Sequence, residues 1–341
     1  MTNKSEASCV LSEADVTDTV KYCIYLFQGI IMFAGNFLLL LPIIGHQAMR
    51  LRKEYILVGG LALVDGLNGV AYILCAIDRI SVIRSCQHHI LVSRWVCAWV
   101  PSNVLWFFID ITLGTMLAAI SFDRLLLVTF PTWYMSQGAL YALCLTGIAY
   151  LHSISSGFVG LYRVWVIRND VAQFKARYCF FTFACEDLYS IYHGSIVSYA
   201  ALASVLIYVL VVVLYKKRSA KLGSRTNEAQ AKRQRKMTVS MGISSFFTLV
   251  LFVIPLQFDV IISHFYQLPK TLAVFCYILA NCNCIMNLFI YLTRHAEVRK
   301  GLKAVFKWRR LPVDLTQWTE KSQTGATGGR STAKTVHASH R

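Results

Sequence analysis

The sequence predicts an all-α membrane protein: a seven-transmembrane helix bundle followed by a short cytoplasmic amphipathic helix. Of its 341 residues, 56% are hydrophobic and only 15% are charged, whereas about a quarter of the residues of a soluble domain are charged. The apolar residues gather in stretches of about 20 or more, the length that a helix needs to cross a ~30 Å hydrocarbon core. Because helices satisfy their own backbone hydrogen bonds in lipid, each stretch is predicted to be a helix.

The predicted spans are apolar on all sides, whereas the helices of a large soluble bundle would repeat a polar face at the helical period. They cover approximately residues 22–44, 54–77, 95–122, 139–162, 191–215, 238–262 and 271–292. Residues 22–292 are therefore predicted to form the transmembrane domain, with Pro101 inside its third helix. The lead before Tyr22 has no basic segment and no obvious cleavage site, so the first span is interpreted as a retained helix and not as a signal peptide.

The distribution of Lys and Arg predicts the orientation of the chain. Basic residues are concentrated in residues 216–236 and 294–310, whereas residues 1–21 hold more acids than bases. The positive-inside rule then places the N-terminus outside and the C-terminus inside, as a multi-pass protein of the plasma membrane. Asn3 opens the sequon Asn-Lys-Ser in this extracellular segment and is a candidate for N-glycosylation. The net charge of +17 is attributed to this orientation and to anionic lipids of the inner leaflet, not to nucleic-acid binding.

The chain after the last span divides into two parts. Residues 293–310 place Val298, Leu302, Val305 and Phe306 on one helical stripe, with basic residues on the other faces. A basic amphipathic helix of this type lies on an anionic leaflet. Residues 311–341 are rich in Ser, Thr, Gly and Lys and poor in apolar residues, so they are predicted to be a disordered cytoplasmic tail.

Several polar residues lie inside the predicted spans, where an ionisable group costs at least ~2.5 kcal/mol at the helix centre. Asp65 lies in the second span, and its carboxylate needs a cation, a proton or several donors. Asn36 in the first span is attributed to hydrogen bonding between helices. Asp123 and Arg124 stand side by side where the third span ends. Pro255 in the sixth span removes a backbone hydrogen bond and is predicted to kink that helix.

Most of the eleven cysteines lie inside the spans and are interpreted as small apolar packing residues. Cys86, Cys97, Cys179 and Cys185 fall on the predicted outer side, where an oxidising environment permits disulfides. One bridge between the start of the third span and the segment before the fifth is expected, but the sequence alone leaves the pairing open.

Taken together, these residues resemble the rhodopsin-like class of G-protein-coupled receptors. The matching motifs keep the order and spacing of that family over approximately residues 22–308. They are Gly35-Asn36, the run Leu61-Ala62-Leu63-Val64-Asp65, Asp123-Arg124, Pro131 with Tyr134, Pro255, and Asn287-Leu288-Phe289-Ile290-Tyr291.

The resemblance implies a switch at the cytoplasmic ends of the helices. Arg124 would be held at rest by Asp123 and by the inner end of helix 6. A ligand bound in the outer half would shift helix 6 about Pro255 and open a cleft for a heterotrimeric G protein, which is a population shift between two packings. Tyr208 and Tyr291 would swing inward to support the active state.

The resemblance also implies a polar cluster in the core and one disulfide. In this family the cluster can host a sodium ion, and its residues here are Asn36, Asp65, Asn283 and Asn287. Leu113 stands where a serine or threonine usually completes that site. Cys97 would pair with Cys179, which is preferred over Cys185.

Departures from the family pattern indicate a divergent member. Leu125 follows Arg124 where an aromatic residue is usual, Leu288 replaces the proline of the helix 7 motif, and Val253 replaces a tryptophan of helix 6. The fourth span contains no tryptophan. This divergence is similar to that of the nematode serpentine chemoreceptors, especially the srsx type, and implies a small chemosensory molecule or a peptide as the ligand.

Two ligand classes can be argued against. The seventh span has no lysine for a retinal Schiff base, and Trp106 occupies the helix 3 position where amine receptors carry an aspartate. Asp110 lies one turn deeper, on the same helical face as Trp106. By resemblance, the residues expected to face an outer ligand cavity are Asn103, Trp106, Asp110, His193, Gln257 and Asp259. No cofactor and no metal centre are expected.

Two other classes of protein remain as alternatives. A membrane transporter or channel would show internal repeats and broken helices near the midplane, and the sequence has no internal repeat. An intramembrane enzyme would need paired acids, a nucleophile with a base, or metal ligands at a recognisable spacing such as H-E-x-x-H, which the sequence lacks. The sequence therefore favours a receptor that is not an enzyme.

Overall fold

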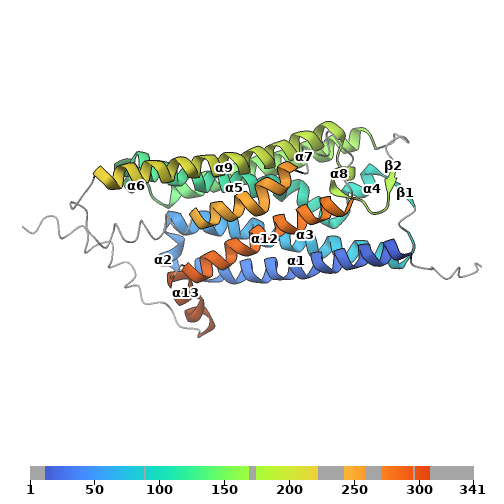
Figure 1. The fold of residues 1–341 in the computed structure, drawn as a ribbon, viewed down its shortest axis with the longest axis horizontal. Helices are drawn as coiled ribbons and strands as arrows, with labels where there is room; N and C mark the ends of the chain where they lie inside the picture. The colour runs from blue at the N-terminus through green and yellow to red at the C-terminus, as the bar shows by residue number, and fades with distance from the viewer. Residues whose placement is uncertain are drawn as a thin grey trace, which may run out of the picture.

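The computed structural model describes residues 12–87, 90–168, 174–221, 242–258, 270–294 and 296–307. Its long helices run along one axis and form an elongated bundle (Figure 1). Six described helices are long and apolar enough to cross a membrane, and a seventh apolar helix, Gly242–Phe258, is described over a shorter length. The six are α1 (Glu13–Gly45), α3 (Lys53–Arg84), α5 (Pro101–Thr129), α7 (Ala139–Val166), α9 (Asp187–Lys221) and α12 (Lys270–Arg294). The predicted all-α transmembrane bundle is confirmed, and we call Gly242–Phe258 the sixth helix.

The short elements gather at the two ends of the bundle, as Figure 1 shows. One end, which we call the disulfide end, carries the strands β1 (Leu91–Ser93) and β2 (Phe174–Ala176) with the helices α4 (Arg94–Ala98) and α8 (Phe181–Ala184). The opposite end, which we call the α13 end, carries α2 (Gln47–Arg50), α6 (Pro131–Ser136) and α13 (Ala296–Phe306).

The first helix begins well before the apolar run that predicted it. Ser12 is its N-cap: the Ser12 hydroxyl accepts a hydrogen bond from the Asp15 amide, and the Asp15 carboxylate accepts one from the Ser12 amide. This reciprocal capping satisfies two amides that the first turn leaves without partners. Acids in the first turn also favour the helix dipole. Residues 13–21, which we assigned to the segment before the first span, therefore belong to α1.

The third long helix differs from the prediction at both ends. Pro101 does not lie inside it but is its first residue, where a proline's missing amide and fixed φ angle favour the helix. Residues 94–98 form the separate helix α4. At its other end α5 continues to Thr129, so Asp123 and Arg124 lie inside the helix and not at its exit.

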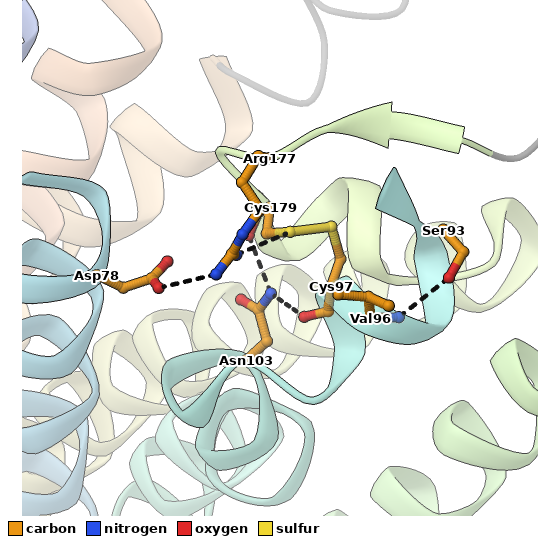
Figure 2. The surroundings of a disulfide bond; sticks show 7 residues. All are labelled: Asp78, Ser93, Val96, Cys97, Asn103, Arg177 and Cys179. Atoms are coloured by element: carbon orange, nitrogen blue, oxygen red, sulfur yellow. Dashed lines mark hydrogen bonds and ion pairs between the residues drawn. A yellow bond between two sulfur atoms is a disulfide. The ribbon is translucent and has the colours of Figure 1, made fainter. Parts of the chain in front are cut away.

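The disulfide predicted by resemblance is present. Cys97 of α4 is bonded to Cys179, in the segment between β2 and α8 (Figure 2). The preference for Cys179 is confirmed, because Cys185 is a buried free thiol. Cys86 is disulfide-bonded as well. Strands β1 and β2 pair antiparallel beside the Cys97–Cys179 bond, with Val92 opposite Lys175.

Glycines let two helices approach closely. A Cβ atom on Gly29 of α1 would lie 2.7 Å from the carbonyl oxygen of Gly69 in α3, and a Cβ on Gly69 would lie 2.6 Å from the Phe33 amide nitrogen. Backbone packing through small residues is the usual means by which helices associate in lipid, where apolar side chains gain nothing by leaving the solvent. The contact fixes α1 against α3 and so places the polar residues of both.

Helix α13 packs back onto the bundle through polar contacts as well as its apolar stripe. The Arg52 guanidinium lies 2.7 Å from a Glu297 carboxylate oxygen, and the Tyr55 hydroxyl donates to the same oxygen at 2.5 Å. His46 Nε2 lies 3.2 Å from the Gly301 carbonyl oxygen. Val298 is fully buried, whereas Phe306, of the same predicted stripe, is exposed.

Three sequence predictions fall outside the described residues. They are the glycosylation candidate Asn3, the ligand candidate Asp259 and the disordered tail 311–341.

Candidate functional site

The most unusual polar group at the α13 end is the buried pair of Asp123 and Arg124. The Arg124 Nε atom lies 3.3 Å from Asp123 Oδ2, and the side chains are 5% and 0% exposed. Consecutive residues of a helix do not face each other, so the contact is a close charge pair without the geometry of a hydrogen bond. A buried ion pair stabilises a fold only if further hydrogen bonds complete it. The stability of this pair therefore depends on the other groups that contact Asp123 and Arg124.

The short helix α6 contributes one such contact. The Tyr134 hydroxyl of α6 donates a hydrogen bond to Asp123 Oδ2 at 3.2 Å. Burial raises the pKa of the Tyr134 hydroxyl well above its usual value, so this group remains a donor. Pro131 starts α6 at the position that a proline favours, and the helix is thereby folded back under α5.

Lys53, the first residue of α3, holds α6 from the other side. Its ammonium lies 3.5 Å from the centre of the Tyr134 ring. It also donates hydrogen bonds to the carbonyl oxygens of Tyr134 and Gln137, the latter at 3.2 Å. A cation at the C-terminus of a helix meets carbonyls that lack partners within the helix. Sequence reasoning missed Lys53, and its only signal was a lysine at the head of an apolar span.

Tyr208 and Tyr291 complete the residues that we predicted for the switch. Both are buried, and both lie close enough to Arg124 to interact electrostatically with its guanidinium. Tyr208 of α9 packs against Gly242 of the sixth helix, where an added Cβ would lie 3.4 Å from the Tyr208 hydroxyl. The structure therefore brings α5, α6, α9, α12 and the sixth helix together around one arginine.

Four polar side chains of the predicted core cluster are buried in the middle of the bundle: Asn36, Asp65, Asn283 and Asn287. Two of them bind the sixth helix. The Ser244 hydroxyl donates to Asn287 Oδ1 at 2.6 Å, and the Thr248 hydroxyl donates to Asn283 Oδ1 at 3.1 Å. Asn36 instead donates to the Met32 carbonyl of its own helix at 2.9 Å, so the predicted bond between helices is wrong for this residue.

Hydrogen bonds hold the cluster together. The side-chain oxygens of Asn283 and Asn287 each accept a hydrogen bond from a hydroxyl group. Leu113 is buried and offers no oxygen. Asp65 faces Cys284 of α12, whose thiol can donate a proton to the carboxylate. The arrangement is a hydrogen-bonded link between helices, and sodium binding at this cluster stays a prediction.

The sixth helix contains a widened turn next to its proline. Residues Leu249–Val253 form a π-helical turn, in which the Ile254 amide bonds to the Leu249 carbonyl. Pro255 follows directly, and it has no amide to donate. Single π turns and prolines are recognised causes of helix bending. Val253, which replaces the family tryptophan, is buried inside this turn.

Trp106, Asp110 and His193 meet near the disulfide end, around the ring of Phe181. The His193 and Trp106 rings lie 4.9 and 6.1 Å from it, centre to centre. His193 Nε2 lies 3.7 Å from Asp110 Oδ2, and the Asp110 side chain is 29% exposed while that of His193 is only 5% exposed. Asp110 is therefore the more accessible member of the pair.

The other ligand candidates occupy different places. Asn103 is buried below the disulfide, where its amide donates to the carbonyl oxygens of Cys97 and Cys179 at 2.8 and 2.9 Å (Figure 2). It supports the fold there, and its role in ligand binding stays a prediction. Gln257 donates to the Ser198 hydroxyl at 2.6 Å, between the sixth helix and α9.

The pattern of one protein family, described as 7 transmembrane receptor (rhodopsin family), matches residues 35–291. This range covers most of the chain and includes Arg124, the buried polar cluster and the residues around Phe181. The chain belongs to the rhodopsin family of seven-transmembrane receptors. A search of curated proteins finds no significant match. The protein is thus a membrane receptor of the G-protein-coupled class, and the srsx subgroup stays a prediction.

The receptor's departures from the family pattern have visible structural counterparts. Leu288 lets α12 continue without a break from Lys270 to Arg294. Its side chain fills the space beside Gly35, where an added Cβ would lie only 2.0 Å from Leu288 Cδ2. The helix that we predicted to lack tryptophan extends to Val166 and so includes Trp165, at its disulfide end.

Proposed function

We propose that this receptor passes an extracellular ligand signal to a heterotrimeric G protein through movement of the sixth helix. The observation that carries the proposal is the buried Arg124, held by Asp123 and covered by α6 at the α13 end. The charge distribution of the sequence supports an orientation with the disulfide end outside the plasma membrane and the α13 end inside.

The resting packing supports a two-state switch. Two hydrogen bonds, Ser244–Asn287 and Thr248–Asn283, tie the sixth helix to α12. The widened turn at Leu249–Val253 and Pro255 lies on the ligand side of both bonds. A bend there would move the part of the helix that carries Gly242 and Ser244. A ligand shifts such an equilibrium only by binding one packing better than the other.

The cleft so opened would admit a G protein. Arg124 would leave Asp123, and Tyr208 with Tyr291 would fill the space beside it. Both tyrosines already lie close enough to Arg124 to interact with its charge.

The ligand site that we propose is the group around Phe181. Asp110 is its accessible acid and His193 its buried base, with Trp106 as an aromatic wall. The Trp106 indole donates to Asn68 at 3.0 Å and packs edge-on against Tyr72 at 5.3 Å, so its ring is preorganised. We propose a small chemosensory molecule or the end of a peptide as the ligand of this site.

Helix α13 is proposed to bind anionic lipids of the inner leaflet. Arg299 and Lys300 are exposed, as is the apolar Phe306, while Val298 faces the bundle. Basic residues beside an exposed apolar one are the composition of a helix that lies in a membrane interface.

Nucleotide exchange tests the proposal directly. The full chain is purified in lipid nanodiscs, mixed with G proteins of each subtype, and screened against a compound and peptide library for stimulated exchange. We expect Arg124→Ala to abolish both basal and stimulated exchange, with unchanged surface expression. The matched control is Arg50→Ala in α2, at the same end of the bundle, which should retain exchange. Stimulated exchange that survives in Arg124→Ala would contradict the proposed switch.

A further inference from the structure

Arg79, near the disulfide end of α3, is a buried charge that the signalling switch does not use. The residue is only 5% exposed. Its guanidinium carbon lies 4.3 Å from the centre of the Phe180 ring and 5.4 Å from that of Tyr22. Among the described residues no carboxylate forms an ion pair with it, and the polar groups that face it are the Tyr22 and Tyr25 hydroxyls and the Cys75 thiol.

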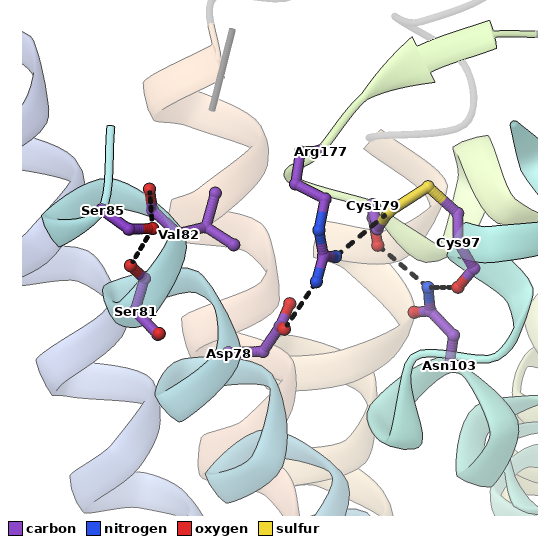
Figure 3. Close-up of polar contacts among 8 residues, drawn as sticks. All are labelled: Asp78, Ser81, Val82, Ser85, Cys97, Asn103, Arg177 and Cys179. Atoms are coloured by element: carbon purple, nitrogen blue, oxygen red, sulfur yellow. Dashed lines mark hydrogen bonds and ion pairs between the residues drawn. A yellow bond between two sulfur atoms is a disulfide. The ribbon is translucent and has the colours of Figure 1, made fainter. Parts of the chain in front are cut away.

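The nearby acids are engaged elsewhere. Asp78, the preceding residue, lies 3.5 Å from the Arg177 guanidinium (Figure 3). Asp18 lies 2.9 Å from the Lys21 ammonium. Asp15 caps α1 through Ser12. The disulfide end of α3 therefore carries more positive than negative charge.

Aromatic faces do not by themselves compensate a buried guanidinium. A cation–π contact is weaker than the effective penalty for burying an ion that has no charged partner. A guanidinium also presents five N–H donors in a planar fork that suits carboxylate and phosphate groups. The rings of Tyr22 and Phe180 hold the fork in place, and the Tyr22 hydroxyl accepts one hydrogen bond from it. Within the described part of the chain, most of the remaining donors have no hydrogen-bond partner.

The position of Arg79 connects it to the proposed ligand site. Phe180, which covers the guanidinium, is followed directly by Phe181. On the other side, a row of rings leads from Tyr25 to Tyr72 at 5.3 Å and from Tyr72 to Trp106 at 5.3 Å. Arg79 and Asp110 thus lie at opposite ends of one aromatic wall.

We propose that Arg79 is the anion-binding subsite of this receptor, which takes the carboxylate or phosphate group of a ligand whose body is aromatic or otherwise apolar. The rings of Tyr25 and Tyr72 would contact the apolar part of this ligand. The ligand's identity as an agonist rests on the proposed function, whereas its binding to Arg79 does not.

Thermal unfolding of the full chain in neutral-lipid nanodiscs tests the proposal. The probes are benzoate, inorganic phosphate, and benzylamine as the cation with the same ring, at constant chloride. We expect benzoate to raise the unfolding temperature with a saturable dependence, phosphate to do so at higher concentration, and benzylamine to have no such effect. Absence of any benzoate and phosphate response in the wild type would overturn the subsite.

The variants decide whether Arg79 is responsible. Arg79→Gln should weaken the apparent benzoate affinity at least about tenfold, because a hydrogen-bonded charge is lost. Arg168→Gln is the matched control, since Arg168 is a half-buried arginine whose guanidinium also lies over an aromatic ring, 4.3 Å from the centre of Trp165. An equal benzoate response in Arg79→Gln and wild type would overturn the proposal. If Arg79→Gln does not fold, Arg79→Lys replaces it in this test. Lysine keeps the positive charge without the planar fork, so this variant should bind benzoate several-fold more weakly than wild type, and equal benzoate affinity would overturn the proposal.

Two further measurements distinguish a soluble anion from a lipid headgroup, and the anion subsite from the signalling proposal. In nanodiscs with anionic lipid, loss of the benzoate response in the wild type would assign the subsite to a lipid headgroup and contradict a soluble ligand. Nucleotide exchange measured on Arg124→Ala and wild type tests signalling independently of anions. Anion binding through Arg79 without any G-protein exchange would therefore refute the signalling proposal alone.

Discussion

The Lys53 ammonium lies 3.5 Å from the centre of the Tyr134 ring, and the Tyr134 hydroxyl donates to Asp123 at 3.2 Å. These two contacts join the start of α3, the short helix α6 and the acid that holds Arg124. Arg124 is therefore held by a chain of three side chains from three elements. Loss of any one should loosen the others.

Lys53→Met tests this chain, because methionine keeps the length of the side chain without its charge. We expect basal nucleotide exchange to rise several-fold, and stability to fall by about 1–3 kcal/mol from the lost cation–π contact and hydrogen bonds. Exchange and thermal unfolding are measured on the same preparation. Arg84→Met, at an exposed basic residue that ends α3, is the control and should change neither. Unchanged basal exchange in Lys53→Met would show that α6 does not restrain Arg124.

The link between the sixth helix and α12 gives a second prediction. Ser244→Ala with Thr248→Ala removes both hydroxyl donors to Asn287 and Asn283. We expect higher basal exchange and a loss of about 1 kcal/mol per hydrogen bond. Thr115→Ala is the matched control, because its hydroxyl bonds only to carbonyls of its own helix. Lower basal exchange in the double variant would mean that the two bonds support the active packing.

The sequence predicted the number and type of the helices because span length and all-round apolarity are local properties. The start of α1 was also visible in the sequence, since Ser12 and Asp15 have the spacing of a capping box. We placed the first span by hydropathy instead, and the apolar run begins only at Tyr22. The contacts of the site were harder to predict. Helices that are apolar on every side do not reveal their rotation, so the partners of Asn283 and Asn287 could not be inferred. The contacts of Lys53 could not be predicted either, because they form only when α6 folds back under α5, and that arrangement depends on residues far apart in the sequence.

Gly35 and Leu288 supply a third prediction, on packing. Gly35→Ala should destabilise the receptor by about 1–3 kcal/mol, because its Cβ would overlap the Leu288 side chain. Adding Leu288→Ala removes the overlap, so the double variant should be more stable than the sum of the two single changes by about 0.5–3 kcal/mol. Thermal unfolding of the four proteins measures this coupling. Strict additivity would show that Leu288 moves aside without cost.

The last prediction concerns acid stability at the disulfide end. Partial burial raises the pKa of Glu186, but hydrogen bonds from Arg163 and from the amides of Tyr189 and Leu188 outweigh it and hold this pKa below its usual value. A carboxylate with a lowered pKa in the folded state stabilises the protein above its unfolded pKa, and this contribution disappears as the pH falls through the folded value. Glu186→Gln should therefore lower the unfolding temperature at neutral pH and reduce its dependence on pH in the acid range. Arg163→Gln, which leaves both amide bonds, should have a smaller effect of the same sign. A variant Glu186→Gln with the full acid response of the wild type would show that other groups cause it.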